Sequence, residues 1–163
     1  MSDSATDPNA NTESAGTPRP APPGIDPRGP RFGAGVTAAL LAITLLLGTS
    51  PAATALLTVV ALLFLIGVTR GVQGTLQGLA FKAWVRPRLS PPTELEDPRP
   101  PRFAQLVGLL VASAGPLFAA LGFPAAVPIA AAVALVAAFL NAAFGLCLGC
   151  ELYLLLRRWN PHR

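Results

Sequence analysis

The sequence predicts an all-α integral membrane protein, a four-helix bundle built from two tandem helix hairpins arranged as parallel repeats. Two long runs without charge and a repeated heptapeptide carry this prediction. No charged side chain occurs over residues 32–69 or over residues 103–150. Because a spanning helix needs about 20 apolar residues, each run is long enough for two helices. The charged fraction of 12% is about half that of an average soluble domain, which excludes a soluble enzyme.

The elements follow in order. Residues 1–25, rich in Ser, Asp, Asn and Pro, are expected to form a disordered cytoplasmic tail. Acidic residues stand at its start and no apolar segment precedes Phe32, so it does not resemble a signal peptide. The four-helix domain is predicted over 26–159, with a first helix at 31–48. Ser50 can cap a second helix that begins at Pro51.

A Pro-rich, charged cytoplasmic loop over 86–102 separates the second helix from a third at 102–121, and a fourth helix begins at about 124. The second and fourth helices continue for more than thirty residues, beyond what a bilayer requires. Either they tilt and protrude, or they bend near 71–74 and 145–149 and lie along the cytoplasmic interface.

The repeat rests on two heptapeptides, Asp26–Phe32 and Asp97–Phe103, which are identical at six of seven positions at an offset of 71. The same offset, continued without gaps, aligns Gly74 with Gly145 and Gly78 with Gly149. We therefore predict repeat one at 26–88 and repeat two at 97–159, related about the membrane normal.

The distribution of basic residues predicts the orientation. All twelve lie before the first helix, between the second and third, or after the fourth. The positive-inside rule then places both termini and the central loop in the cytoplasm, with the protein in the cell (inner) membrane. Trp84, Tyr153 and Trp159 lie on the same side, as an interfacial aromatic belt does. This asymmetry accounts for the net charge of +4 without a nucleic-acid partner.

Four polar residues near this side are candidates for a polar path or a partner-binding face. Arg70, Gln73 and Gln77 share one face of a continuous helix, which fits an interfacial stripe or, alternatively, the wall of a substrate path. Asn141 is a single amide in an apolar segment, where an interhelical hydrogen bond is more common than a catalytic contact.

The two cysteines, Cys147 and Cys150, form a C-x-x-C pair. This spacing permits a short disulfide, thiol–disulfide exchange or ligation of a soft metal, while cysteine also packs well between helices. Metal ligation is the least favoured interpretation, because two thiolates leave a four-ligand site incomplete. A dimer that pairs two such motifs would supply four thiolates. The pair is expected late in an apolar helix beside Glu151, and both features disfavour a thiolate. Glu151 can instead accept a proton.

Three segments, 85–89, Asp97–Phe103 and Asn141–Tyr153, resemble a family of small actinobacterial membrane proteins catalogued as domain of unknown function 4395. The resemblance covers residues 25–158, and Cys-Leu-Gly-Cys-Glu is its most specific part. It implies a role in thiol or sulfane-sulfur handling.

We expect Cys147 and Cys150 to cycle between dithiol and disulfide, or to carry sulfur, with Glu151 accepting a proton. The expected partners are the lipid bilayer and a cytoplasmic thioredoxin-like or rhodanese-like protein, with a homo-oligomer left open. No cofactor and no resident metal are predicted. The alternative is a non-enzymatic scaffold or small-solute permease in which the cysteines only pack.

Overall fold

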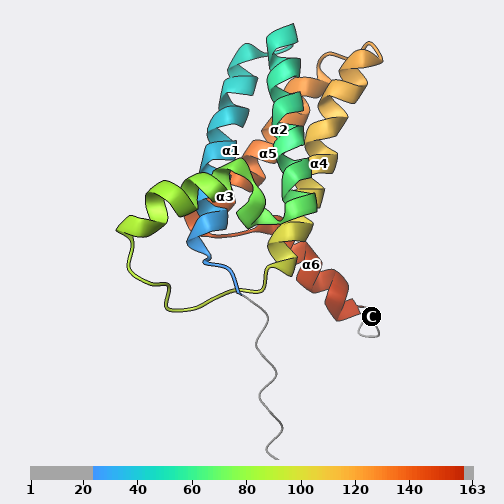
Figure 1. Cartoon of the computed structure of the whole chain (residues 1–163). Helices are drawn as coiled ribbons and strands as arrows, with labels where there is room; N and C mark the ends of the chain where they lie inside the picture. Colours follow the sequence, from blue (N-terminus) through green and yellow to red (C-terminus); the bar gives the residue numbers. More distant parts are fainter. Residues whose placement is uncertain (1–23, 160–163) are drawn as a thin grey trace, which may run out of the picture.

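A computed structural model describes residues 24–159, which contain four helices long and apolar enough to cross a membrane (Figure 1). These are α1 (Arg28–Leu47), α2 (Pro51–Arg70), α4 (Arg99–Ala120) and α5 (Ala126–Phe144). The predicted all-α membrane bundle is therefore confirmed. The tail predicted over residues 1–25 lies almost wholly outside the described residues.

The four long helices form a closed ring in which every neighbour is antiparallel. α1 packs against α2 and α5, while α4 packs against the same two helices from the other side. The starts of α1 and α4 and the ends of α2 and α5 therefore meet at one end of the bundle, near which α3 and α6 lie (Figure 1). All ten basic residues within 24–159 belong to this end, which we call the basic end.

Local sequence explains where the spans begin. As predicted, the Ser50 side chain caps α2 by accepting a hydrogen bond from the Ala53 amide at 3.2 Å, with Pro51 at the first helical position. α1 and α4 begin at Arg28 and Arg99, three residues earlier than expected. Proline is tolerated in a first helical turn, where its missing N–H has no intrahelical partner, so the prolines do not delay the helices.

The two overlong helices are broken, which decides between the predicted alternatives. α2 ends at Arg70 before Gly71, and α5 ends at Phe144 before Gly145. Both glycines have positive φ, +77° and +71°, a conformation that glycine adopts without a Cβ penalty. The chain then continues in short, separate segments at the basic end, so each span bends there and does not continue as one helix.

The segment after Gly71 consists of η1 (Val72–Gly74), α3 (Leu76–Ala80), the π-helical η2 (Phe81–Val85) and η3 (Arg86–Arg88). After Gly145 there is one helix, α6 (Leu148–Trp159). The single helical face expected for Arg70, Gln73 and Gln77 is therefore wrong, because these residues lie on α2, η1 and α3 respectively.

The heptapeptides occupy equivalent places, although the two hairpins differ in length. α1 and α4 begin 71 residues apart, but the breaks at Gly71 and Gly145 are 74 apart. The ungapped alignment of Gly74 with Gly145 therefore does not match the structural breaks. The difference arises because α4 and the turn after it are both longer than α1 and its turn. The repeat itself stays a prediction.

Each heptapeptide contributes an arginine to the hairpin formed by the other half of the chain. Arg102 donates to the Val68 and Thr69 carbonyls at the end of α2, at 2.6 and 3.2 Å. Arg31 donates to the Ala143 carbonyl at the end of α5, at 3.5 Å. The last carbonyls of a helix lack intrahelical partners and carry partial negative charge, so both arginines satisfy and stabilise these ends.

The closely packed core lies in the half of the bundle away from the basic end. Its fully buried side chains come from all four spans and include Leu41, Leu57, Val127 and Ala131. Gly115 permits the close approach of α4, since a Cβ there would meet the Leu57 side chain at 2.6 Å. The half nearer the basic end is less filled, and the candidate site lies there.

Candidate functional site

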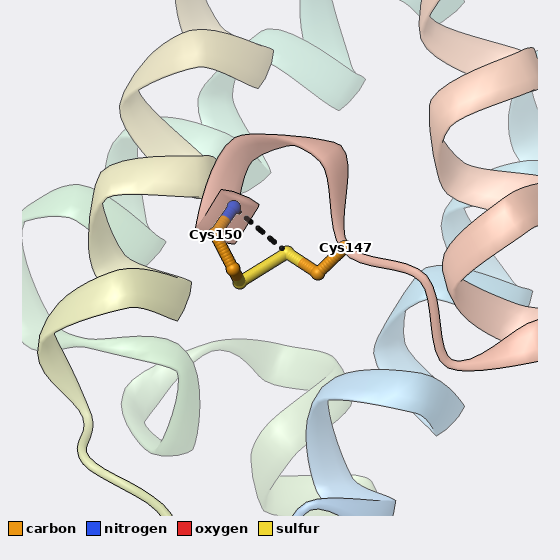
Figure 2. Close-up of a disulfide and its surroundings, with 2 residues drawn as sticks. All are labelled: Cys147 and Cys150. Carbon is orange, nitrogen blue, oxygen red and sulfur yellow. Dashed lines mark hydrogen bonds between the residues drawn. A yellow bond between two sulfur atoms is a disulfide. The ribbon is translucent and has the colours of Figure 1, made fainter. Parts of the chain in front are cut away.

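The cysteine pair is positioned by the break at Gly145. The Gly145 amide donates to the Asn141 carbonyl at 3.0 Å and its left-handed conformation ends α5. The chain reverses course over Gly145–Cys147 and α6 begins at Leu148. Cys147 therefore immediately precedes α6, and Cys150 lies in its first turn (Figure 2).

The two cysteines form a disulfide with a Cα–Cα distance of 5.2 Å, inside the range typical of disulfides. Figure 2 shows the Cys150 amide donating to Sγ of Cys147, at 3.3 Å. Both residues are half-buried.

This geometry corrects the expected electrostatics. The pair does not lie late in an apolar helix; it opens α6, because Gly145 ends the preceding span. The amides at a helix N-terminus are unpaired and carry partial positive charge, so this position stabilises a thiolate. The Cys150 amide already points at Cys147 Sγ, which makes Cys147 the better stabilised of the two sulfurs after reduction.

Glu151 lies in the same first turn, with its amide donating to the Cys147 carbonyl at 3.0 Å. Its side chain is exposed and does not line the pocket described below. Within the described part of the chain, no group of three or more His, Cys, Asp or Glu residues could hold a metal ion.

α6 is held against the start of α4. Gly149 lies on Ala104, and a Cβ at Gly149 would be 2.6 Å from the Ala104 Cα. The Tyr153 ring packs against Phe103 with centroids 5.6 Å apart. This close approach of α6 to α4 fixes Cys150 relative to the bundle.

A pocket of about 370 Å³ opens beside the disulfide, between the spans and the short helices at the basic end. Both cysteines line it. Its deeper wall is apolar and includes Val60, Phe64 and Val111 from the middle of α2 and α4. The less filled half of the bundle therefore opens beside the two cysteines.

Polar side chains from several elements also line this pocket. Of the sequence-predicted candidates, Gln77 and Asn141 lie on its wall with the cysteines, whereas Arg70 and Gln73 are exposed outside it. Sequence reasoning missed further members: Arg31, Gln105 and two buried threonines, Thr37 and Thr75. Gln105 was detectable as an isolated amide in an apolar run, but its position beside Gly67 of α2 depends on helix packing.

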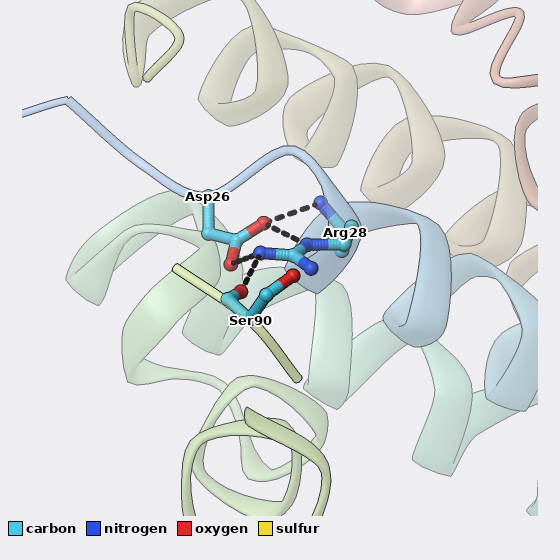
Figure 3. A network of polar contacts seen from close by, with 3 residues as sticks. All are labelled: Asp26, Arg28 and Ser90. Atoms are coloured by element: carbon cyan, nitrogen blue, oxygen red, sulfur yellow. Dashed lines mark hydrogen bonds and ion pairs between the residues drawn. The ribbon is translucent and has the colours of Figure 1, made fainter. Parts of the chain in front are cut away.

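Backbone and side-chain bonds join the starts of the two hairpins next to the pocket, which Glu96 lines. Ile25 and Glu96 exchange backbone hydrogen bonds, both at 2.9 Å. Next to them, Asp26 accepts hydrogen bonds from the Arg28 amide and guanidinium at 3.0–3.1 Å, and Arg28 also donates to the Ser90 carbonyl (Figure 3). Burial alone would raise the pKa of Asp26, but these bonds and the charges of Arg28 and Arg86 lower it overall.

Four membrane-spanning helices, a disulfide at a helix N-terminus and an adjoining pocket define a small multi-pass membrane protein with a cysteine site at its basic end. The chain belongs to the family described as Domain of unknown function (DUF4395), whose model matches residues 25–158. No curated protein and no solved structure matches the chain.

Proposed function

We propose that this protein is a membrane thiol–disulfide oxidoreductase that works through Cys147 and Cys150. The observation that carries the proposal is the disulfide at the start of α6, with the Cys150 amide directed at Cys147 Sγ. A structural packing role needs no such hydrogen bond and no pocket beside the sulfurs, whereas exchange chemistry needs a stabilised thiolate and access to it.

The proposed reaction is reversible exchange with a dithiol partner. A partner thiolate attacks the disulfide and forms a mixed disulfide, and the second partner thiolate resolves it. The partner leaves with its own disulfide and this chain keeps two thiols, so two electrons and two protons are transferred. In the reverse direction Cys147 attacks and Cys150 resolves, because the α6 N-terminus stabilises the Cys147 thiolate. Glu151 accepts the proton released on the solvent side.

The charge of the basic end favours a cytoplasmic partner with an acidic surface. The described residues carry ten basic and five acidic side chains, and these lie at or next to this end of the bundle. By the positive-inside rule this end faces the cytoplasm, where a thioredoxin-like or rhodanese-like protein is available. The exposed leucines of α6, together with Trp159, support a location of this helix at the membrane interface.

A trapping experiment tests the proposal. The full chain is reconstituted in lipid nanodiscs as Cys150→Ser and incubated with an oxidised thioredoxin, with Cys147→Ser as the matched control. We expect Cys150→Ser to form a mixed disulfide with thioredoxin, identified by mass, and Cys147→Ser to form much less. A gain of one sulfur atom from a persulfide donor would instead identify a sulfur carrier.

Wild-type protein is followed in parallel by alkylation after treatment with reduced thioredoxin. A disulfide that stays intact under all reducing conditions tested, or cysteines that never react once reduced, would contradict the proposal. The non-enzymatic scaffold or permease would then be favoured, with Cys147 and Cys150 in a packing role.

A further inference from the structure

The bundle is filled unevenly along its length. Fully buried side chains such as Leu41, Leu57 and Val127 occupy the half away from the basic end. The other half contains the pocket of about 370 Å³, a size within the range of small-molecule sites, roughly 300–1,000 Å³. A fully packed interior in the half nearer the basic end would make the fold more stable. We therefore expect a ligand to occupy the pocket.

The lining of this pocket defines the chemistry of that occupant. The deep wall is apolar, with Leu63, Phe64, Val107 and Val133 contributed by the middle of three spans. The rest of the lining includes hydrogen-bonding side chains. A molecule that matches both parts has an apolar body and a polar head group.

The polar groups of the wall suit a head group that accepts hydrogen bonds. Gln77, Gln105 and Asn141 each carry an amide N–H₂ donor, and Arg31 carries a guanidinium. Arg31 lies beside Gly145, two residues before Cys147, where a Cβ on Gly145 would be 3.5 Å from the guanidinium carbon. A carbonyl oxygen that gains negative charge during reduction would be stabilised by such donors.

We propose that this pocket binds the head group of a lipid-soluble quinone, which oxidises the reduced Cys147–Cys150 pair. This inference rests on the proposed redox function and names its electron acceptor. Cysteine pairs exchange two electrons and two protons, and quinones are the two-electron carriers that dissolve in a bilayer. Both cysteines line the pocket, so a head group bound there lies next to its reductant.

The proposed step balances. The two sulfurs lose two electrons as the S–S bond forms between Cys147 and Cys150. The quinone gains those electrons, and the two thiol protons are transferred to its two oxygens, giving the hydroquinone. A cytoplasmic dithiol then reduces the disulfide again, so the net reaction carries electrons from a cytoplasmic dithiol into the membrane quinone pool.

The test uses the full chain in lipid nanodiscs, reduced and freed of reductant, with ubiquinone-1 as the probe. Because its ring is fully substituted, thiols do not add to it readily. Ala137→Phe fills the pocket from α5, and Val136→Phe is the matched control, because Val136 is exposed on the same helix and does not line the pocket. Disulfide formation is followed by alkylation, and hydroquinone formation by ultraviolet absorbance.

We expect wild type and Val136→Phe to be oxidised at a rate that saturates with ubiquinone-1. Ala137→Phe should slow this oxidation by about tenfold or more, because a filled pocket prevents positioning of the reactants, while its exchange with thioredoxin is unchanged. Equal, non-saturating rates in all three proteins, with thioredoxin exchange intact, would overturn the quinone site but not the proposed function. Loss of thioredoxin exchange in wild type would contradict the proposed function itself.

A second measurement separates binding from chemistry and from misfolding. In the Cys147→Ser, Cys150→Ser double variant, ubiquinone-1 should raise the thermal unfolding midpoint, because a ligand bound to the folded state stabilises it. Replacing Asn141 with Leu, which keeps the side-chain size but removes the amide, should reduce this shift. A double variant whose midpoint does not respond to ubiquinone-1 would overturn the proposed site.

Discussion

Replacing Gly149 with alanine tests how α6 is docked. A Cβ at this position would lie 2.6 Å from both Cα and Cβ of Ala104 on α4, whereas carbon atoms pack best at about 3.5–4.0 Å. The opposing atoms belong to the backbone and first side-chain carbon of a long helix, so they cannot rotate away. Relief of the contact therefore requires α6 to move outward by about 1 Å.

The magnitude follows from two opposing effects. Overpacking of this kind costs about 1–3 kcal/mol, and alanine recovers up to about 1 kcal/mol over glycine through helix propensity. The net cost to docking of α6 is then about 1–2 kcal/mol, which corresponds to roughly a tenfold increase in the population of the undocked helix. Cys150 moves with α6, so the disulfide should also become easier to reduce.

Hydrogen–deuterium exchange on the full chain in nanodiscs measures this effect directly. Amides of α6 should exchange about tenfold faster in Gly149→Ala, while those of the four spans stay unchanged. Gly35→Ala is the control, because a Cβ there would make an ordinary contact of 3.9 Å with Ala142, and it should be neutral or stabilising. Unchanged α6 exchange in Gly149→Ala would refute the argument that glycine is needed for docking.

Three further changes probe the basic end. Arg102→Gln removes two hydrogen bonds to the end of α2, so we expect a loss of about 1 kcal/mol in thermal unfolding, with only partial recovery in Arg102→Lys. Asp26 has a lowered pKa, so its contribution to stability is present above its ordinary pKa, near 3.8, and is lost as pH falls through the folded value. Asp26→Asn should therefore be less stable at pH 7 and lose less stability on acidification, as thermal unfolding at pH 2–7 would show; parallel curves would argue against this. Glu151→Gln should slow thioredoxin exchange at pH 7 if the carboxylate accepts a proton, whereas faster alkylation of Cys147 would show that it acts only through its charge.

The four spans were predictable because amino-acid composition alone, long apolar segments without charge, identifies membrane-spanning helices. Two runs without charge, divided by a capping Ser50–Pro51 pair and bounded by arginines, leave few alternatives in a bilayer. The starts of α1 and α4 lie three residues before the predicted ones, because the first helical turn accommodates the Pro- and Arg-rich segment that precedes each apolar run.

The cysteine site was harder to predict because it depends on one backbone conformation. Had Gly145 been helical, Cys147 and Cys150 would have faced the same side late in a long span. Its positive φ instead ends α5. The cysteines then lie at the N-terminus of the next helix, where the partial charge of the helix dipole is positive and not negative. Sequence allows both conformations for glycine, so it suggested a bend but not its electrostatic consequence.

The pocket was not predictable from sequence, because it forms where side chains from different helices leave space between them, and this depends on how the helices pack. Gln77 and Asn141 were singled out for their polarity, and both line the pocket. Gln105 carries the same type of signal, yet only the packing of α4 on α2 brings it to the same wall.

The exchange of arginines between the two halves has a consequence for biogenesis. Arg102 stands at the start of the third span. The carbonyls at the end of the second span can therefore accept hydrogen bonds from it only once the third span has been synthesised. Arg31 stands at the start of the first span, but its acceptor, the Ala143 carbonyl, belongs to the fourth span and is synthesised much later. Neither half is expected to mature alone, so Cys147 and the first turn of α6 take their final positions only after all four spans have been inserted. A truncated or half-inserted chain would thus lack the assembled cysteine site and its pocket.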